Sequence, residues 1–200
     1  RSTLLASSAA SDVYKRQSPE EAYKMIGEAF EYSEKYNTPV LFRPTTRVCH
    51  AYASIDNCDS PSPKKYEGFV KDSKKWVIFP RLSFANHIMI EKRNVEIGKD
   101  FSTYSANKAE GGNSEKAVVT SGISYAYTKE CLKDYPDVKL IKIATAYPFP
   151  EDFVLSSLED AKEVLCIEEL SPFIEEQILK LAGKHGLQLK VSGKLDGKVQ

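Results

Sequence analysis

The residues best suited to chemistry follow an apolar run at residues 39–42, in the sequence Thr45-Thr46-Arg47-x-x-His50. Arg47 can hold a carboxylate through two parallel N–H groups. His50 can transfer a proton, because the ordinary pKa of imidazole lies near neutrality. The alternative is that Arg47 and His50 tie a strand-end loop to a neighbouring domain or subunit. The sequence leaves both interpretations open.

A pair of carboxylates, Glu168 and Glu169, follows a second apolar run at residues 164–167. Such a pair can act as a general acid and a general base. Adjacent residues on an extended chain point to opposite faces, however, so only one of the two can face a given site. We therefore favour a structural role, as a carboxylate at a helix end or in a salt bridge at an interface.

The helix after this pair has its own start signal. Ser171 is a suitable N-cap, and Pro172 suits the first helical position because no N–H is needed there. The helical spacing of the apolar residues that follow predicts that Glu175 and Glu176 face solvent.

Weaker candidates lie elsewhere in the chain. Ser121 and Gly122 form a strand-to-helix turn whose backbone N–H groups can hold an anion, although one glycine does not make a phosphate-binding loop. His87 and His185 are lone histidines and are interpreted as surface or capping residues. The sequence contains no zinc-protease, nucleophile-elbow, Walker or dinucleotide-binding motif.

The elements that position these groups predict an α/β fold. Short apolar runs alternate with amphipathic stretches, which is typical of a mostly parallel sheet covered by helices on both faces. In such sheets, ligands and partners meet the carboxyl ends of the strands. The strands are expected at residues 117–120, 138–144, 164–167 and 187–191, and the helices at residues 123–134, 152–158 and after Pro172. In the helix at residues 123–134, Tyr127, Cys131 and Leu132 are expected to face inward.

The first half of the chain predicts another α/β unit followed by a connection. A helix begins at Ser18-Pro19 and ends near Asn37, and a buried strand occupies residues 39–42. The remaining segments are a polar linker at residues 56–65, an extended segment at residues 76–79, a long helix at residues 81–100 and a loop at residues 102–114.

Composition excludes several classes of protein. The 200 residues carry 28 basic and 28 acidic side chains, so the chain lacks the positive charge of a nucleic-acid binder. No apolar run approaches the roughly 20 residues that a membrane span needs.

The four cysteines lack metal-ligand spacing and indicate a reducing, cytoplasmic setting. Cys131 and Cys166 are expected to be buried thiols. A disulfide between Cys49 and Cys58 is the minority alternative.

The two ends of the chain differ from the rest. Residues 1–17 are rich in serine and alanine and resemble cloning-adapter sequence, so we expect a foreign or disordered segment and leave it out of the fold. The last residues, 193–200, stop without a closing element. We therefore expect a fragment of a longer polypeptide.

Three stretches resemble the alpha subunit of indolepyruvate ferredoxin oxidoreductase, in the thiamine-diphosphate-dependent 2-oxoacid:ferredoxin oxidoreductase group. They are TPVLFRPTTRVCHA, AVVTSGISYAY and YPFPEDF with VLCIEELSPFIEEQI, and they occur in the same order as in that family. The similarity extends over residues 18–199.

The resemblance implies a division into domains. Residues 18–56 would be the C-terminal end of the pyrimidine-binding domain, residues 57–114 a linker with a long helix, and residues 115–200 a transketolase C-terminal-like domain. The whole enzyme would oxidatively decarboxylate arylpyruvates, using thiamine diphosphate with Mg²⁺ and 4Fe-4S clusters. Its partners would be the remainder of the alpha subunit, a beta subunit, ferredoxin and coenzyme A.

No residue of this chain matches the cofactor-binding positions of that family. We therefore expect the chain alone to bind no cofactor or metal, to be inactive, and to supply scaffold and subunit contacts. The alternatives are another 2-oxoacid oxidoreductase, a transketolase-like enzyme, or a non-catalytic α/β interaction module. Exposed sheet edges and exposed apolar faces would favour a fragment over a module.

Overall fold

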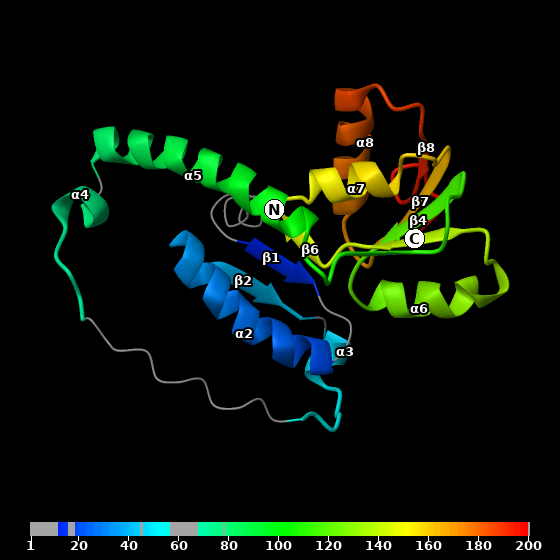
Figure 1. Cartoon of the computed structure of the whole chain (residues 1–200), viewed down its shortest axis with the longest axis horizontal. Helices are drawn as coiled ribbons and strands as arrows, with labels where there is room; N and C mark the ends of the chain where they lie inside the picture. Colours follow the sequence, from blue (N-terminus) through cyan, green and yellow to red (C-terminus); the bar gives the residue numbers. More distant parts are fainter. Residues whose placement is uncertain (1–11, 16–18, 45, 57–67, 78, 200) are drawn as a thin grey trace.

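The computed structural model describes residues 12–15, 19–44, 46–56, 68–77 and 79–199, which form two β-sheets with helices packed against them (Figure 1). The larger sheet has the strand order β3-β5-β4-β7-β8, and the smaller sheet has the order β2-β1-β6. The predicted mostly parallel α/β architecture is therefore present. Among the described residues, no helix combines the length and apolar character needed to cross a membrane.

The larger sheet is parallel except for one edge strand. Strands β4, β5, β7 and β8 run parallel to one another, and β3 pairs antiparallel with β5. In the registers next to the central strand β4, Thr120 is paired with Lys142 on one side and with Ile167 on the other. The bounds are β3 Lys108–Glu110, β4 Lys116–Thr120, β5 Lys139–Lys142, β7 Glu163–Ile167 and β8 Lys190–Ser192.

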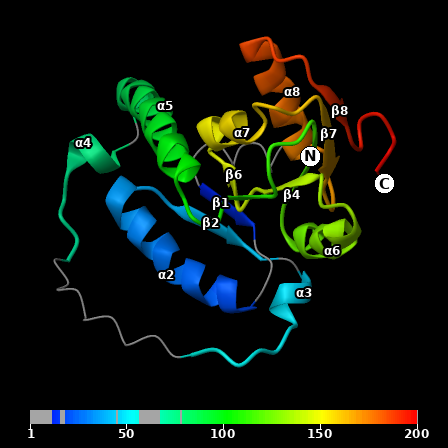
Figure 2. The same cartoon turned by 45° about the vertical axis from the view of Figure 1, so that its right-hand side comes forward.

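Helices cover both faces of the larger sheet (Figure 2). Val119 belongs to a core that α7 (Glu151–Ser157) and α8 (Phe173–His185) help to form, whereas Val118 packs with Tyr125 of α6 (Ile123–Cys131). Both faces of β4 are thus buried, which explains the continuous apolar run in the sequence. A 3-10 turn, η1 (Leu132–Asp134), follows α6.

The smaller sheet contains β1 (Asp12–Lys15), β2 (Val40–Arg43) and β6 (Thr145–Tyr147). Strand β1 pairs parallel with β2 and antiparallel with β6. A separate core joins α2 (Pro19–Tyr36) to α5 (Pro80–Ser102). Its buried residues are Met25, Ile97, Phe101 and Ala144.

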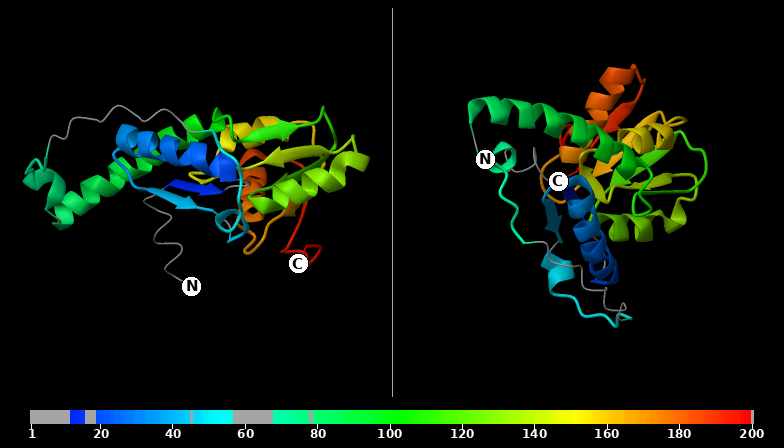
Figure 3. Two further views of the ribbon diagram at one scale, coloured as in Figure 1. Left: turned by 90° about the horizontal axis from the view of Figure 1, so that it is seen from below. Right: turned by 60° about the vertical axis from the view of Figure 1, so that its left-hand side comes forward.

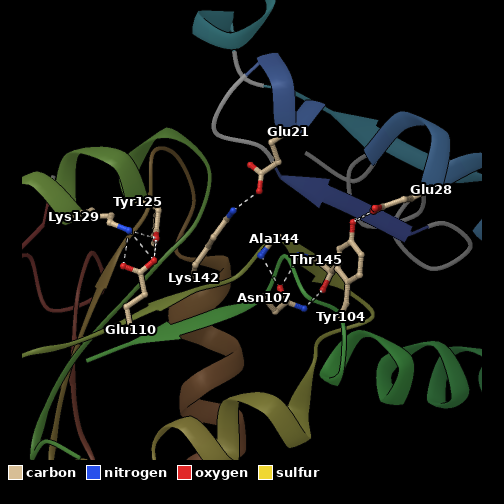
Figure 4. Close-up of polar contacts among 10 residues, drawn as sticks. All are labelled: Glu21, Glu28, Tyr104, Asn107, Glu110, Tyr125, Lys129, Lys142, Ala144 and Thr145. Atoms are coloured by element: carbon tan, nitrogen blue, oxygen red, sulfur yellow. Dashed lines mark hydrogen bonds and ion pairs between the residues drawn. The ribbon is translucent and has the colours of Figure 1, made fainter. Parts of the chain in front are cut away.

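The chain passes directly from the larger sheet to the smaller one between β5 and β6, which are separated only by Ile143 and Ala144. Asn107 braces this crossing (Figure 4). Its Oδ1 accepts hydrogen bonds from the N–H groups of Ala144 at 2.8 Å and Thr145 at 3.2 Å. Its Nδ2 donates to the Phe101 carbonyl and to the Thr145 hydroxyl. All four polar positions are buried, so the crossing has a defined geometry.

Two segments differ from the sequence predictions. The predicted loop at residues 102–114 contains β3, an edge strand too short and polar to show an apolar pattern. The predicted extended segment is present at Val77 and Phe79, whereas Trp76 is the last residue of α4 (Ser73–Trp76), which Asp72 caps by accepting a hydrogen bond from the Lys74 N–H. Four residues of the segment left out of the fold form β1, because backbone pairing with β2 and β6 needs no apolar sequence.

Burial also differs from prediction at several positions. Helix α6 turns Ser124, Tyr125 and Thr128 inward, so the helical period is correct but its phase is shifted. Cys131 and Tyr127 are exposed, contrary to prediction, whereas Cys166 is buried. Strand β2, predicted to be buried, is half-buried on one face and exposed on the other, and it lies at the edge of its sheet.

The remaining cysteine alternative is only partly visible. Cys49 is an exposed free thiol, and Cys58 lies outside the described residues.

Candidate functional site

The larger sheet brings two of the predicted sites together. Strands β4 and β7 are parallel neighbours, so the Ser121-Gly122 turn and the Glu168-Glu169 turn lie side by side at their carboxyl ends. From β4 the chain continues into α6 on one face of the sheet, and from β7 it continues into α8 on the other face (Figure 2). This arrangement is the topological switch point where open α/β sheets commonly bind ligands.

Glu168 uses its carboxylate to begin α8. Its side chain is buried, with the residue 4% exposed, and accepts hydrogen bonds from the N–H groups of Ile174 at 2.9 Å and Glu175 at 3.1 Å. The N–H groups of the first helical turn have no partner within the helix, and the helix dipole also favours a negative charge there. The predicted cap at Ser171 is wrong. Helix α8 begins at Phe173, so its N-cap residue is Pro172, whose side chain accepts no hydrogen bond from the helix. Glu169 is exposed.

Glu175 is only 2% exposed, so its predicted position facing solvent is wrong. Its carboxylate accepts hydrogen bonds from the N–H groups of Lys194 at 2.8 Å and Leu195 at 3.1 Å. The turn after β8 therefore folds over this face of α8. Gly193 allows the close approach, because a Cβ there would lie 2.6 Å from Glu175 Oε2.

Cys166 lies on β7 close to these two carboxylates. Burial raises the pKa of its thiol well above the usual range, and the charges of Glu168 and Glu175 raise it further. The thiol consequently stays protonated near neutral pH and is a core side chain rather than a nucleophile.

The Ser121-Gly122 turn provides backbone geometry without an open site. Gly122 has φ 61° and ψ −143°, a conformation that side-chain-bearing residues rarely adopt. Ser121 and Gly122 are both buried. A ligand therefore reaches their N–H groups only where the surrounding side chains move aside.

The cluster after β2 belongs to the other sheet. Helix α3 (Thr46–Cys49) is the next element after β2, and the His50 N–H donates to the Thr46 carbonyl at 3.1 Å. Thr46 and His50 are exposed, whereas Val48 is buried beneath them. Thr45 and the side chain of Arg47 lie outside the described part. For the described members of the cluster, Thr46 and His50, no hydrogen bond or ion pair reaches the carboxyl-end turns of β4 and β7. The role of the cluster stays a prediction.

A polar network that the sequence analysis missed connects α2 to the larger sheet (Figure 4). The Lys142 ammonium on β5 pairs with the Glu21 carboxylate on α2, with only 4% of the Lys142 side chain exposed. Its Nζ also lies 5.4 Å from the centre of the Tyr125 ring. The Tyr125 hydroxyl donates to Glu110, which is paired with Lys129 at 2.7 Å.

The electrostatics of this network follow from burial and pairing. Burial lowers the pKa of Lys142, and the Glu21 carboxylate opposes that shift. Burial alone would raise the pKa of Glu110, but hydrogen bonds from Lys129 and Tyr125 outweigh it and lower the pKa. Each of these groups is satisfied by another, so the network joins two parts of the fold and offers no free acid or base.

The sequence does contain a signal for this network. Two lysines, Lys139 and Lys142, occur within an otherwise apolar strand run, and a buried ammonium needs a partner. Lys139 finds one in the Ser157 carbonyl at 3.0 Å. The signal indicates buried pairing but does not identify the partner.

Two surface hollows lie away from these turns. They have volumes of about 630 and 370 Å³ and are lined by segments that precede β4, β5, β7 and β8. Both are thus at the amino ends of the parallel strands. Among the described residues, no three His, Cys, Asp or Glu side chains are grouped as metal ligands.

Comparisons with known proteins identify relatives. No family model matches the chain. The indolepyruvate oxidoreductase subunit IorA of Methanothermobacter thermautotrophicus is 34% identical over 183 residues, which cover 90% of this chain and 29% of the relative. The IorA subunit of Thermococcus kodakarensis is 33% identical over 190 residues, covering 91% of this chain and 29% of the relative. The chain thus spans about three tenths of the length of these relatives, and the predicted resemblance is confirmed.

A solved structure shares the fold. The 2-oxoglutarate:ferredoxin oxidoreductase from Magnetococcus marinus, with 2-oxoglutarate, coenzyme A and succinyl-CoA bound, superposes with a TM-score of 0.60 at 14% identity. The match covers 91% of this chain and 38% of that chain. It confirms the predicted fold class.

Proposed function

The chain is homologous to a segment of the indolepyruvate oxidoreductase IorA subunits, and we propose that it serves in an enzyme that oxidatively decarboxylates arylpyruvates. Indolepyruvate is the proposed substrate, coenzyme A the acyl acceptor and ferredoxin the electron acceptor. The observation that carries this proposal is similarity to IorA over nine tenths of the chain. The fold shared with a 2-oxoacid:ferredoxin oxidoreductase supports it.

Within that enzyme the segment supplies scaffold and subunit contacts. Its buried ionisable groups support this role, because they hold other parts of the segment: Glu168 and Glu175 bind backbone N–H groups, and Lys142 pairs with Glu21. Thiamine diphosphate, Mg²⁺ and the iron–sulfur clusters then belong to other parts of the alpha subunit and to the beta subunit. We place this assembly in the cytoplasm.

The proposed domain organisation follows the family. Residues 18–56 end the pyrimidine-binding domain, residues 57–114 form the linker, and residues 115–200 form the transketolase C-terminal-like domain. Four strands of the five-stranded sheet lie after residue 115, in agreement with the second boundary, whereas its edge strand β3 (Lys108–Glu110) lies within the proposed linker.

A segment exchange tests the function. Residues 19–199 of this chain replace the matching segment of the Methanothermobacter IorA subunit, which is expressed with its natural partner subunit. We expect reduction of a viologen dye or ferredoxin that depends on both indolepyruvate and coenzyme A. The unmodified relative is the positive control. A chimera that assembles with the control's mass and cofactor content but oxidises no 2-oxoacid contradicts the proposal.

The same chimera tests the substrate. A second candidate is another 2-oxoacid, because the solved structure that shares the fold contains 2-oxoglutarate. Indolepyruvate, phenylpyruvate, pyruvate and 2-oxoglutarate are therefore compared at equal concentration. A preference for 2-oxoglutarate or pyruvate that the unmodified relative lacks would replace the arylpyruvate assignment. The separate 200-residue chain, assayed with all cofactors added, is expected to be inactive.

A further inference from the structure

Helix α4 and the first two thirds of α5 form an arm that extends away from the larger sheet (Figure 3). No described residue from 68 to 96 is buried, and the buried residues of α5 are Ile97 and Phe101 near its other end. An isolated helix of about 15 residues is marginally stable in water without packing. Within this chain, Arg93 donates hydrogen bonds to the Tyr36 and Asn37 carbonyls and Lys75 donates one to the Asn37 side chain. These polar contacts hold the arm near the end of α2 but leave its large apolar side chains exposed.

Large apolar side chains cover the arm. Phe84 is 70% exposed, and the others are also more than a third exposed. A half-exposed aromatic side chain offers about 100 Å², so the set offers roughly 500 Å² in total. Phe84, Ile88 and Val95 share one face of α5, because they are four and seven residues apart. We call these residues the arm patch: Trp76, Phe79, Phe84, Ile88, Met89 and Val95.

Helix α2 carries a second apolar surface on its outer side. Ile26 and Phe30 are one helical turn apart, and Phe30 is 70% exposed. Between them, Gly27 has nothing within 4 Å of the place where a Cβ would lie. A glycine inside an exposed helix costs about 0.5–1 kcal/mol relative to alanine. The missing side chain leaves room for a helix of another molecule to pack closely at this position. These three residues are the α2 patch.

The two surfaces carry opposite charge although the whole chain is neutral. Residues 69–95 contain six basic and two acidic side chains, whereas α2 contains five acidic and two basic ones. Lys92 lies beside the arm patch, and Glu31 lies beside the α2 patch; both are exposed. Opposite potentials favour contact between the two surfaces, and like potentials disfavour contact between two arms or two α2 helices.

We propose that the arm patch of one copy of this chain packs on the α2 patch of a second copy. Each copy contributes both surfaces, so a twofold axis gives two equivalent contacts and a closed dimer. The two patches of one copy together offer about 700 Å², close to the roughly 800 Å² per partner of a standard stable interface. This contact does not depend on the proposed activity.

Sedimentation equilibrium of the 200-residue chain at 1–100 µM tests the contact. We expect a dimer, and we expect Phe84→Asp and Phe30→Asp each to weaken it at least tenfold while the circular dichroism spectrum stays unchanged. Tyr52→Asp is the matched control, because Tyr52 is fully exposed outside both patches. It leaves the dimer intact.

A charge exchange tests the pairing of the two surfaces. Glu31→Lys and Lys92→Glu each weaken the dimer, and the double variant restores it. A chain that remains monomeric at 100 µM overturns the proposal. A dimer that survives Phe84→Asp and Phe30→Asp also overturns it, as does a double variant weaker than both single variants.

Discussion

The two adjacent glutamates after β7 allow a test of how α8 is held. Glu168→Gln and Glu169→Gln make the same chemical change at neighbouring positions. Only the first carboxylate is buried against the helix, where it accepts hydrogen bonds from the N–H groups of Ile174 and Glu175. We expect Glu168→Gln to destabilise the fold and Glu169→Gln to leave its free energy of unfolding within about 0.5 kcal/mol of wild type.

The magnitude follows from the interactions that are lost. Glutamine keeps one acceptor oxygen but places an NH₂ group against the second backbone N–H, so one hydrogen bond to a charged group is lost. Such a bond contributes about 1.5–3 kcal/mol. Removing the negative charge from the first turn of α8 costs about 0.3–1 kcal/mol more. The expected loss for Glu168→Gln is therefore about 2–4 kcal/mol.

Urea unfolding of the full chain at pH 7 measures the global effect, and amide hydrogen exchange measures the local one. The N–H groups of Ile174 and Glu175 should exchange faster in Glu168→Gln than in Glu169→Gln, even at urea concentrations where both variants are folded. The local measurement distinguishes a lost cap from a general loosening of the core. In a general loosening, amides of β4 and β5 lose protection equally.

Equal free energies of unfolding for the two variants, within about 0.5 kcal/mol, would refute the reasoning. Unchanged exchange at the two α8 amides in Glu168→Gln would refute it independently. A loss confined to Glu169→Gln would show that the register of the turn after β7 is shifted by one residue.

Three further predictions concern other contacts. Gly193→Ala should destabilise the chain by about 1–3 kcal/mol in a urea titration, because the added Cβ meets the buried Glu175 carboxylate. Gly183→Ala is the control at an open helical position and should stabilise the chain by about 0.5–1 kcal/mol. Hydrogen bonds from the N–H groups of Gly193 and Lys198 lower the pKa of Asp196 to about 2, so Asp196→Asn should reduce stability at pH 6, with the difference disappearing as the pH falls to 2. Glu21→Gln removes the negative charge that pairs with the Lys142 ammonium and should cost about 3 kcal/mol at pH 7, the lower end of the range for a broken buried ion pair, because Glu21 is partly exposed and glutamine keeps one acceptor oxygen. Because burial lowers the folded pKa of that lysine, thermal melts should show this cost shrinking as the pH rises toward 10.

Local sequence patterns predicted the elements that are buried on both faces. The runs that became β4 and β7 are continuously apolar, and the run that became β5 is apolar except for two lysines, because helices cover both sides of that sheet. The start of α2 and the extent of α5 were also visible in capping residues and helical spacing. These features depend on neighbours within a few residues, and a single sequence displays them directly.

The contacts that sequence reasoning missed are long-range. The partner of Lys142 lies 121 residues earlier in the chain, and no periodicity connects the two positions. Glu175 follows the spacing of a solvent-facing residue, and it is buried only because the turn after β8 returns to α8. Strand β3 was missed because a three-residue edge strand needs no apolar alternation.

The crossing from β5 to β6 contains only two residues, so the orientation of the smaller sheet relative to the larger one depends on the φ and ψ angles of Ile143 and Ala144. Asn107 restricts these angles, because its side chain bonds to the N–H groups of Ala144 and Thr145 and to the Phe101 carbonyl near the end of α5. One buried amide therefore couples the orientation of α5 to the orientation of both sheets.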